Sequence, residues 1–214
     1  MAESPKETPT RRRRARRGEG DRLREEILEA AEGLLIETGD EEAVSIRAVA
    51  EAVGVTPPSI YLHFQDKNEL LFEVCERHFE RFDQVLEEAA ARSDDPFESL
   101  RLRGRAYVQF GVENPEQYRI LFMRKRATLP EDVDFDRIRG AAAFGHLVDA
   151  VQRCMDAGAL PPRDPFLVAT ILWIQIHGIT SLLISMPQFP WPDRDELIDQ
   201  LCWAARVGPE PPAS

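Results

Sequence analysis

The residues best suited to bind an anion stand where two short helices are predicted to begin. Ser45 opens the first helical pattern, and its hydroxyl and backbone N–H can both donate to a phosphate. Arg47, one turn into that helix, can reach a phosphate or the acceptor edge of guanine. Further candidates for contact with a nucleic acid follow closely: Thr56, Pro57, Pro58, Ser59, Tyr61, His63 and Lys67.

These later candidates differ in what they offer. Pro57 and Pro58 can make only apolar contact, for example to a thymine methyl group. Tyr61 and His63 are long enough to donate to a phosphate backbone, and Lys67 can bind a phosphate as a point charge. The residues alone leave two alternatives open: Tyr61 as a core aromatic, and His63 as a helix-end residue that bonds a carbonyl.

The elements that position these residues form a helix-turn-helix pattern. Ser45 is a good N-cap for a helix that runs through Ala52, and Gly54 follows where a helix must stop. Thr56 can cap a second helix, because Pro57 then falls at its first position, where proline is tolerated. Apolar residues at helical spacing give the two helices a core face: Ile46, Val49, Ala50, Val53, Ile60 and Phe64.

The rest of the 214-residue chain reads as helix, because alternation over strand lengths is scarce. An amphipathic helix over residues 21–38 precedes the motif. Asp95–Pro96 and Asp164–Pro165 are predicted to open two later helices, the second of them uncharged up to Pro192. The other helices are predicted over residues 66–92, from Pro115, over 134–157 and over 193–207.

Charge is distributed unevenly. The chain has 27 Lys/Arg and 38 Asp/Glu, a net charge of −11. Residues 1–24 nevertheless carry nine basic and four acidic side chains, so an arginine-rich arm precedes an acidic body. We expect residues 1–20 to be disordered in free solution and able to contact DNA phosphates, with a passive tail as the alternative. The tail at 208–214 is also expected to be disordered.

The ordered series from a helix ending near Gly39 to Lys67-Asn68-Glu69-Leu70-Leu71 resembles the DNA-binding domain of the TetR family of bacterial transcriptional regulators. The resemblance implies an all-α fold with a three-helix DNA-binding domain over 21–65. It also implies a helical-bundle domain over 66–207 for effector binding and dimerisation. In this family Thr56 to Ser59 would stand at the N-terminal end of the recognition helix, nearest the base edges.

The C-terminal part resembles one subclass of that family, marked by a Trp-His-Gly signature. Trp173, His177 and Gly178 carry this signature, and the run Asn114–Phe122 looks like a second motif of the same subclass. A cavity in the helical domain would suit an apolar or aromatic small molecule, with Gln175 and His177 as polar contacts. Its candidate lining residues, most of them also ordinary core residues, are Phe79, Phe82, Tyr107, Phe110, Phe122, Met123, Phe144, Trp173 and His177.

Motifs for other chemistry are not found. The sequence has no glycine-rich nucleotide loop, no HExxH and no paired His/Cys spacing, so neither a metal nor another cofactor is predicted. His78, His146 and His177 read as isolated histidines on apolar faces. Three scattered cysteines and no signal peptide favour the reducing cytoplasm. The uncharged segment is long enough to span a membrane, but its polar residues favour a buried helix in a core or dimer interface.

We therefore expect a homodimeric DNA-binding regulator and not an enzyme. The last two helices are expected to pair with those of a second chain, so the operator should be palindromic. The favoured mechanism is a repressor that a small ligand releases from DNA. Two alternatives stay open: an activator or a regulator that responds to a protein partner, and a helical enzyme that carries a DNA-binding module.

Overall fold

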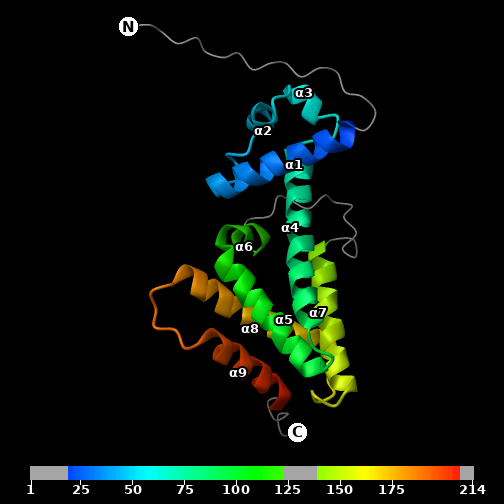
Figure 1. Cartoon of the computed structure of the whole chain (residues 1–214), viewed down its shortest axis with the longest axis vertical. Coiled ribbons are helices and arrows are strands. Elements are labelled where there is room, and N and C mark those ends of the chain that lie inside the picture. The colour runs from blue at the N-terminus through cyan, green and yellow to red at the C-terminus, as the bar shows by residue number, and fades with distance from the viewer. Residues whose placement is uncertain (1–18, 123–138, 208–214) are drawn as a thin grey trace. The chain divides into compact units, whose positions relative to one another are not determined.

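The computed structural model describes residues 19–122 and 139–207, and every regular element in these ranges is a helix (Figure 1). The predicted arm, the predicted C-terminal tail and Met123 lie outside the described residues, apart from the arm's last two positions. The all-α prediction is confirmed. The helices are α1 (Glu19–Thr38), α2 (Ile46–Val53), α3 (Pro57–Ile60), α4 (Lys67–Ala90), α5 (Pro96–Glu113), α6 (Pro115–Phe122), α7 (Arg139–Asp156), α8 (Pro165–Ser185) and α9 (Arg194–Val207).

The chain divides into two compact units, one up to Cys75 and one from Glu76. The first contains α1 to α3 and the first residues of α4, and the second contains the rest of α4 with α5 to α9. The sequence places the domain boundary after residue 65, at the start of α4. The two compact units meet within that helix, and the buried residues Leu70, Leu71 and Val74 belong to the first unit.

Local capping explains where α2 begins and ends. The Ser45 hydroxyl oxygen accepts from the Ala48 backbone N–H at 3.1 Å, which satisfies one of the unpaired donors of the first turn. Gly54 ends the helix at φ 75°, a left-handed conformation that glycine adopts at least cost. The backbone N–H of Val55 donates back to the Ala50 carbonyl, so the chain turns directly toward α3.

The second helix of the motif is shorter than its sequence pattern suggests. α3 ends at Ile60, and a turn follows in which the N–H groups of His63 and Phe64 both donate to the Ile60 carbonyl. Thr56 stands at the N-cap position but makes no side-chain cap bond, since its Oγ1 lies 3.1 Å from Ser59 Oγ instead. Ile60 and Phe64 are buried in the first unit as predicted.

The start of α4 is also fixed locally. The Asp66 carboxylate accepts from the Glu69 backbone N–H at 2.9 Å, while the Glu69 carboxylate accepts from the N–H of Gln65. This reciprocal pattern resembles a capping box and holds the first residues of the helix in place. Arg24 of α1 pairs with Glu73 of α4 at 2.5 Å and lies over the Phe64 ring at 5.0 Å. Contacts within the first unit therefore hold the beginning of α4 firmly.

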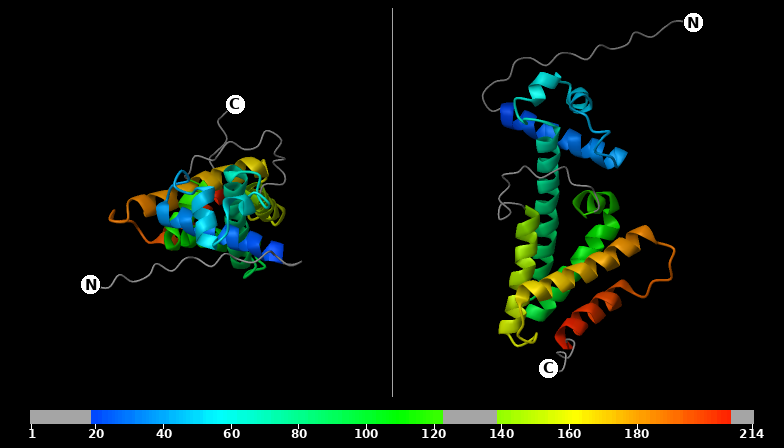
Figure 2. Two further views of the ribbon diagram at one scale, coloured as in Figure 1. Left: turned by 90° about the horizontal axis from the view of Figure 1, so that it is seen from above. Right: turned by 180° about the vertical axis from the view of Figure 1, so that it is seen from behind.

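The second unit is organised around α5. An Asp-Pro pair opens both α5 and α8, as predicted: Asp95 accepts from the Glu98 N–H at 2.7 Å, and Asp164 from the Phe166 N–H at 3.0 Å. α5 packs against α6, α7, α8 and α9, and α8 also packs against α7 and α9 (Figure 2). Residues on several faces of α5 are therefore buried.

Ion pairs join α5 to α9. Arg101 donates to both carboxylate oxygens of Asp199, at 2.8 Å from Nη2, and Arg105 donates to the same group at 3.1 Å. Burial alone would raise the pKa of Asp199, but these two guanidinium groups lower it below its ordinary value. Asp199 therefore stays charged at neutral pH and helps to hold α9 against α5.

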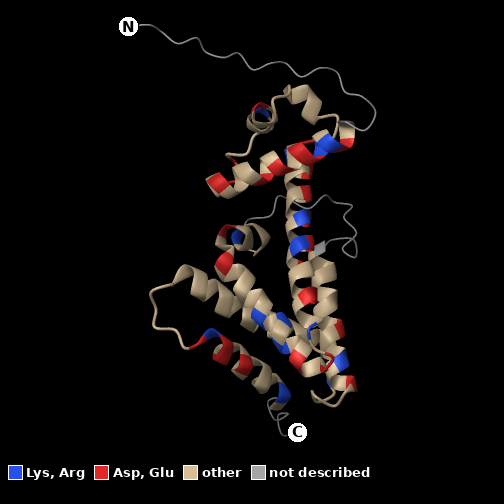
Figure 3. Cartoon of the chain, in the orientation of Figure 1, with Lys and Arg blue, Asp and Glu red and all other residues tan. Residues whose placement is uncertain are grey.

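α8 contains no charged residue, and it is uniformly tan in Figure 3. Its length and composition alone would allow it to cross a membrane. Only 28% of its most apolar window is buried within this chain, so most of that window is left uncovered by the other helices. Several large apolar side chains on α8 are exposed, among them Leu167, Ile171, Ile174 and Leu182. A regular stripe of this kind, at spacings of three, four or eight residues, needs a covering surface.

Candidate DNA-binding surface and ligand cavity

The polar residues predicted to contact DNA lie on the accessible part of the first unit. Tyr61 is 55% exposed, so the alternative of a core aromatic does not fit the structure. Ser59, His63 and Lys67 are half-buried. The remaining candidates, Ser45, Arg47, Thr56, Pro57 and Pro58, are exposed.

Two cations of this surface are available for phosphates. Within the described ranges, neither Arg47 of α2 nor Lys67 of α4 has an acidic side chain within ion-pair distance. By contrast, Arg22 pairs with Glu26 at 2.9 Å. Ser45 uses its oxygen as an acceptor in the cap, which leaves its hydroxyl proton free to donate. The beginnings of α2 and α4 thus offer unpaired donors, as an anion-binding surface requires.

A cavity of about 600 Å³ lies within the second unit, a size typical of small-molecule sites. Seven of the nine predicted residues line it: Phe79, Phe82, Tyr107, Phe122, Phe144, Trp173 and His177. Phe110 is not among the lining residues, because it packs in the core with its ring centroid 5.1 Å from that of Phe82. Gln175, the other predicted polar contact, is exposed and does not line the cavity either.

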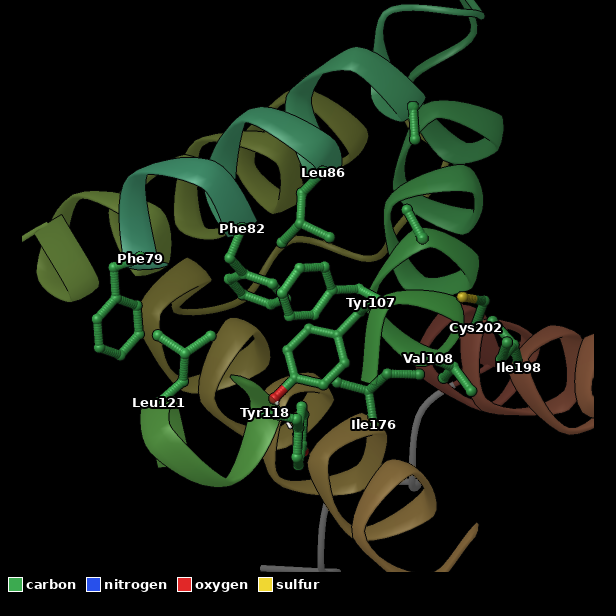
Figure 4. Packing of buried hydrophobic residues seen from close by; sticks show 13 residues of the cluster. Phe79, Phe82, Leu86, Tyr107, Val108, Tyr118, Leu121, Ile176, Ile198 and Cys202 are labelled. Carbon is green, nitrogen blue, oxygen red and sulfur yellow. Dashed lines mark hydrogen bonds between the residues drawn. The ribbon is translucent and has the colours of Figure 1, made fainter. Parts of the chain in front are cut away.

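Aromatic rings form much of the cavity wall. Phe82 of α4 and Tyr107 of α5 meet edge to face at 5.1 Å, and Figure 4 shows them converging with Leu86. The ring centroid of Phe122 on α6 lies 5.6 Å from that of Phe82. The ring centroid of Trp173 on α8 lies 5.8 Å from that of Phe144 on α7. Because the rings come from five helices, their packing defines the shape of the cavity.

Two residues of the wall, Tyr107 and His177, form a small polar cluster with Tyr118, which does not itself line the cavity. The hydroxyl oxygens of Tyr107 and Tyr118 lie 3.1 Å and 2.7 Å from His177 Nδ1, and 3.3 Å from each other. Burial raises the pKa of both tyrosines, so their hydroxyl groups stay protonated. A neutral His177 can then accept a tyrosine proton at Nδ1, whereas a protonated imidazole cannot. Burial of the cluster therefore favours the neutral histidine, and a tyrosine oxygen can also accept from Nδ1–H in the other tautomer.

Burial lowers the pKa of His177, and this predicts a pH dependence of stability. Below the ordinary histidine pKa of about 6.5, the unfolded chain binds a proton that the folded protein disfavours. Stability is therefore expected to fall as the pH drops from 7.5 to 5.5. His177→Gln should lose less stability over this interval, as measured by urea unfolding at each pH. Parallel pH profiles for the two proteins would remove His177 as the cause.

Sequence reasoning missed several lining residues. Leu86, Leu172, Ile176 and Ile198 are aliphatic core positions that helical spacing marks as buried without indicating a cavity. Arg103 carried a clearer signal: it stands one turn before Tyr107 on the same face of α5, where a charged residue is unexpected. It is 3% exposed, and its Nη2 donates to Glu87 of α4.

His146 is not isolated on an apolar face, contrary to the sequence interpretation. It is exposed, and its Nδ1 lies 2.9 Å from an Asp83 oxygen and 3.7 Å from a Glu87 oxygen. In the part of the chain that the structure describes, these three residues form a group whose ligand atoms could surround a cation. Glu87 already accepts from Arg103, however, so this group is more simply read as an ion-pair network.

The cysteines behave as predicted where they are buried. Cys154 and Cys202 are free thiols with almost no exposure, and burial raises their pKa values to about 11 and about 12. Cys75 is a half-buried thiol. The two buried thiols are therefore protonated at neutral pH and serve as small apolar side chains, Cys202 in the cavity wall.

Two family models match this chain. The one for bacterial regulatory proteins of the tetR family matches residues 27–74, which contain α2 and α3. The one for the tetracyclin repressor-like C-terminal domain matches residues 100–204. The narrower Trp-His-Gly subclass stays a prediction.

Three named proteins are similar over most of the chain. The HTH-type transcriptional activator FasR of Mycolicibacterium smegmatis is 24% identical over 188 residues, which cover 88% of this chain and 80% of that protein. SmeT, the repressor of the Stenotrophomonas maltophilia multidrug efflux pump SmeDEF, is 25% identical, with a TM-score of 0.63 and 85% and 89% of the two chains covered. FadR of Bacillus subtilis, solved with stearoyl-CoA, is 16% identical, with a TM-score of 0.67 and 87% and 99% covered. At this identity, the last similarity shows the fold alone.

Proposed function

We propose that this chain, which belongs to the TetR family of transcriptional regulators, represses a palindromic operator until a small ligand binds its cavity. Proteins of this family are soluble, DNA-binding transcription regulators that act in the cytoplasm. The single observation that carries the ligand half is the cavity of about 600 Å³ with an aromatic wall. The Trp-His-Gly assignment rests on Trp173, His177 and Gly178, the last two of them half-buried in that wall.

The proposed dimer interface is the exposed apolar surface of α8 and α9. Leu167, Ile171, Ile174 and Leu182 are each at least 44% exposed on α8, and Trp203 is 55% exposed on α9. Covering this surface with the same surface of a second chain would form a four-helix interface with twofold symmetry. Recognition helices related by that symmetry would read two half-sites about 34–36 Å apart, or a related spacing.

The ligand and the operator are proposed to be linked through two states of the second unit. A ligand releases DNA only if it binds the DNA-incompatible state more tightly. A coupling of about 1–3 kcal/mol would lower operator affinity by roughly 5- to 150-fold. Acyl chains and aromatic acids or alcohols are suitable first probes, because the cavity wall is mainly apolar.

Selection of genomic fragments by the purified protein tests the DNA-binding half of the proposal. We expect retention of a few fragments that share an inverted repeat, and a footprint symmetric about its centre. If no fragment is retained at low salt, the proposal of an operator fails. The selected fragment then serves in every later measurement.

Activation is the second candidate, because the similar protein FasR is an activator. Transcription in vitro from the selected promoter separates the two. A repressor lowers transcript yield and its footprint overlaps the promoter, whereas an activator raises the yield from an upstream position. We expect repression that a cavity ligand reverses.

A further inference from the structure

Arg103 is an unusual residue to find in the wall of this cavity. It is 3% exposed, and it is the only lining residue, within the described ranges, that carries a permanent charge. Its Nη2 donates to a Glu87 oxygen, but Nε and Nη1 are buried without a hydrogen-bond partner among the described residues. A guanidinium group has five N–H donors, so most of its hydrogen-bonding capacity is unused.

The other polar groups of the cavity do not compensate for this. The polar groups of Tyr107 and His177 are satisfied by each other and by Tyr118. The remaining lining atoms belong mainly to aromatic and aliphatic side chains, which offer no acceptor. A buried charge with unused donors is costly in an apolar surrounding, unless something that binds there completes its hydrogen bonds.

We propose that the cavity binds a monoanionic amphiphile, a carboxylic acid with an apolar or aromatic body, whose carboxylate is held by Arg103. This inference rests on the proposed function, since it names the class of ligand that the cavity takes. A carboxylate matches the planar donor array of a guanidinium group. A dianion such as a phosphate monoester would leave one negative charge uncompensated in an apolar cavity, because Arg103 supplies a single positive charge.

Glu87 competes with the ligand for the same guanidinium. The Glu87 side chain is 43% exposed, so water can solvate it when a ligand carboxylate takes its place on Arg103. Glu87 lies on α4, the same helix whose first residue, Lys67, is predicted to bind a phosphate. Exchange of partners at Arg103 therefore changes the contacts of α4, and this gives the ligand a route to the DNA-reading end of that helix.

The test uses paired probes that differ only in the charged group. Binding of 4-phenylbutyrate and of 4-phenylbutan-1-ol, together with hexanoate to decanoate and the matching alcohols, is measured by calorimetry on the full chain. For the wild type we expect the acids to bind at least tenfold more tightly than their alcohols. Arg103→Met should abolish this preference while alcohol affinity stays within about threefold, and Arg103→Lys should restore part of it.

A second variant tests the competition. Glu87→Gln removes the competing charge, so it is expected to strengthen acid binding several-fold and leave alcohol binding unchanged. Arg103→Met leaves only a partly exposed carboxylate behind, and its melting curve checks that it folds. An acid preference that survives in Arg103→Met overturns the inference. Alcohols that bind as tightly as acids and release the operator overturn it too, but leave the proposed function standing. If neither the acids nor the alcohols bind, the cavity is not the effector site, and both this inference and the proposed release by a cavity ligand are wrong.

Discussion

Binding of the selected operator by the double variant Tyr61→Ala/Lys67→Ala is expected to be about 10- to 100-fold weaker than that of the wild type, a loss of about 1.4–2.8 kcal/mol. Tyr61 is 55% exposed, and Lys67 at the start of α4 has no acidic partner in the described ranges, so neither side chain is needed by the first unit's core. Lys67 would neutralise one phosphate, and the slope of log affinity against log salt should therefore decrease by about 1. Fluorescence anisotropy of a labelled operator between 50 and 200 mM salt measures both quantities.

A variant with the same loss of charge elsewhere separates local contact from net charge. Arg153→Ala removes one positive charge from an exposed position on α7, in the second unit. It makes the chain as acidic as Lys67→Ala does, yet it should leave the affinity and the salt slope nearly unchanged. The acidic body makes this control necessary, because a net charge of −11 already opposes association with DNA. Unchanged binding by the double variant would remove Tyr61 and Lys67 from the DNA-contacting surface.

Features that depend on neighbouring residues in the chain were predictable. Ser45 and Gly54 delimit α2, and the Asp-Pro pairs at Asp95 and Asp164 open α5 and α8, because capping chemistry acts within one turn of the backbone. The exposure of Tyr61 also agrees with the preferred reading of the motif. These local signals were enough to predict the all-α fold and to locate the candidate DNA-contacting residues.

The division of apolar faces among several neighbours was not predictable. Leu28 is buried and Leu34 only half-buried, although both are leucines of the same amphipathic helix. Val85 of α4 is apolar, yet it is 40% exposed, while Leu86 beside it is buried. α8 is apolar on every face, so its periodicity does not distinguish the inner face from the exposed one. Such choices depend on which helix packs on which face, and that information lies far apart in the sequence.

The same reason explains why the cavity was only partly predicted. Seven of the nine candidate residues line it because aromatic side chains leave gaps where they meet from several helices. Phe110 is an aromatic residue of α5, as Tyr107 is. It does not line the cavity, because its ring packs in the core beside Phe82. Arg103 was passed over because charged residues are usually assigned to the surface.

The close contact between α5 and α8 predicts a large loss of stability for Gly111→Ala. A Cβ atom at this position would stand 2.3 Å from Thr180 Cγ2 and 3.0 Å from Tyr118 Cδ2. Thr180 and Tyr118 are both fully buried, so neither can move aside at low cost. We expect the free energy of unfolding to fall by about 1–3 kcal/mol, even though alanine favours the helix more than glycine does. Calorimetry should show the melting temperature lowered by about 2–4 °C for each kcal/mol.

Two further variants assign this loss to the contact with Thr180. Gly145→Ala changes a glycine of α7 whose added Cβ would meet nothing within 4 Å, so it should stabilise the protein by up to about 1 kcal/mol. Thr180→Ser removes the methyl group that the new Cβ would meet and retains the hydroxyl that donates to the Ile176 carbonyl at 2.8 Å. The double variant Gly111→Ala/Thr180→Ser should therefore recover part of the loss, and only part, because the contact with Tyr118 remains. If Gly111→Ala and Gly145→Ala instead raised the melting temperature alike, α5 and α8 would not approach each other as closely as the structure describes.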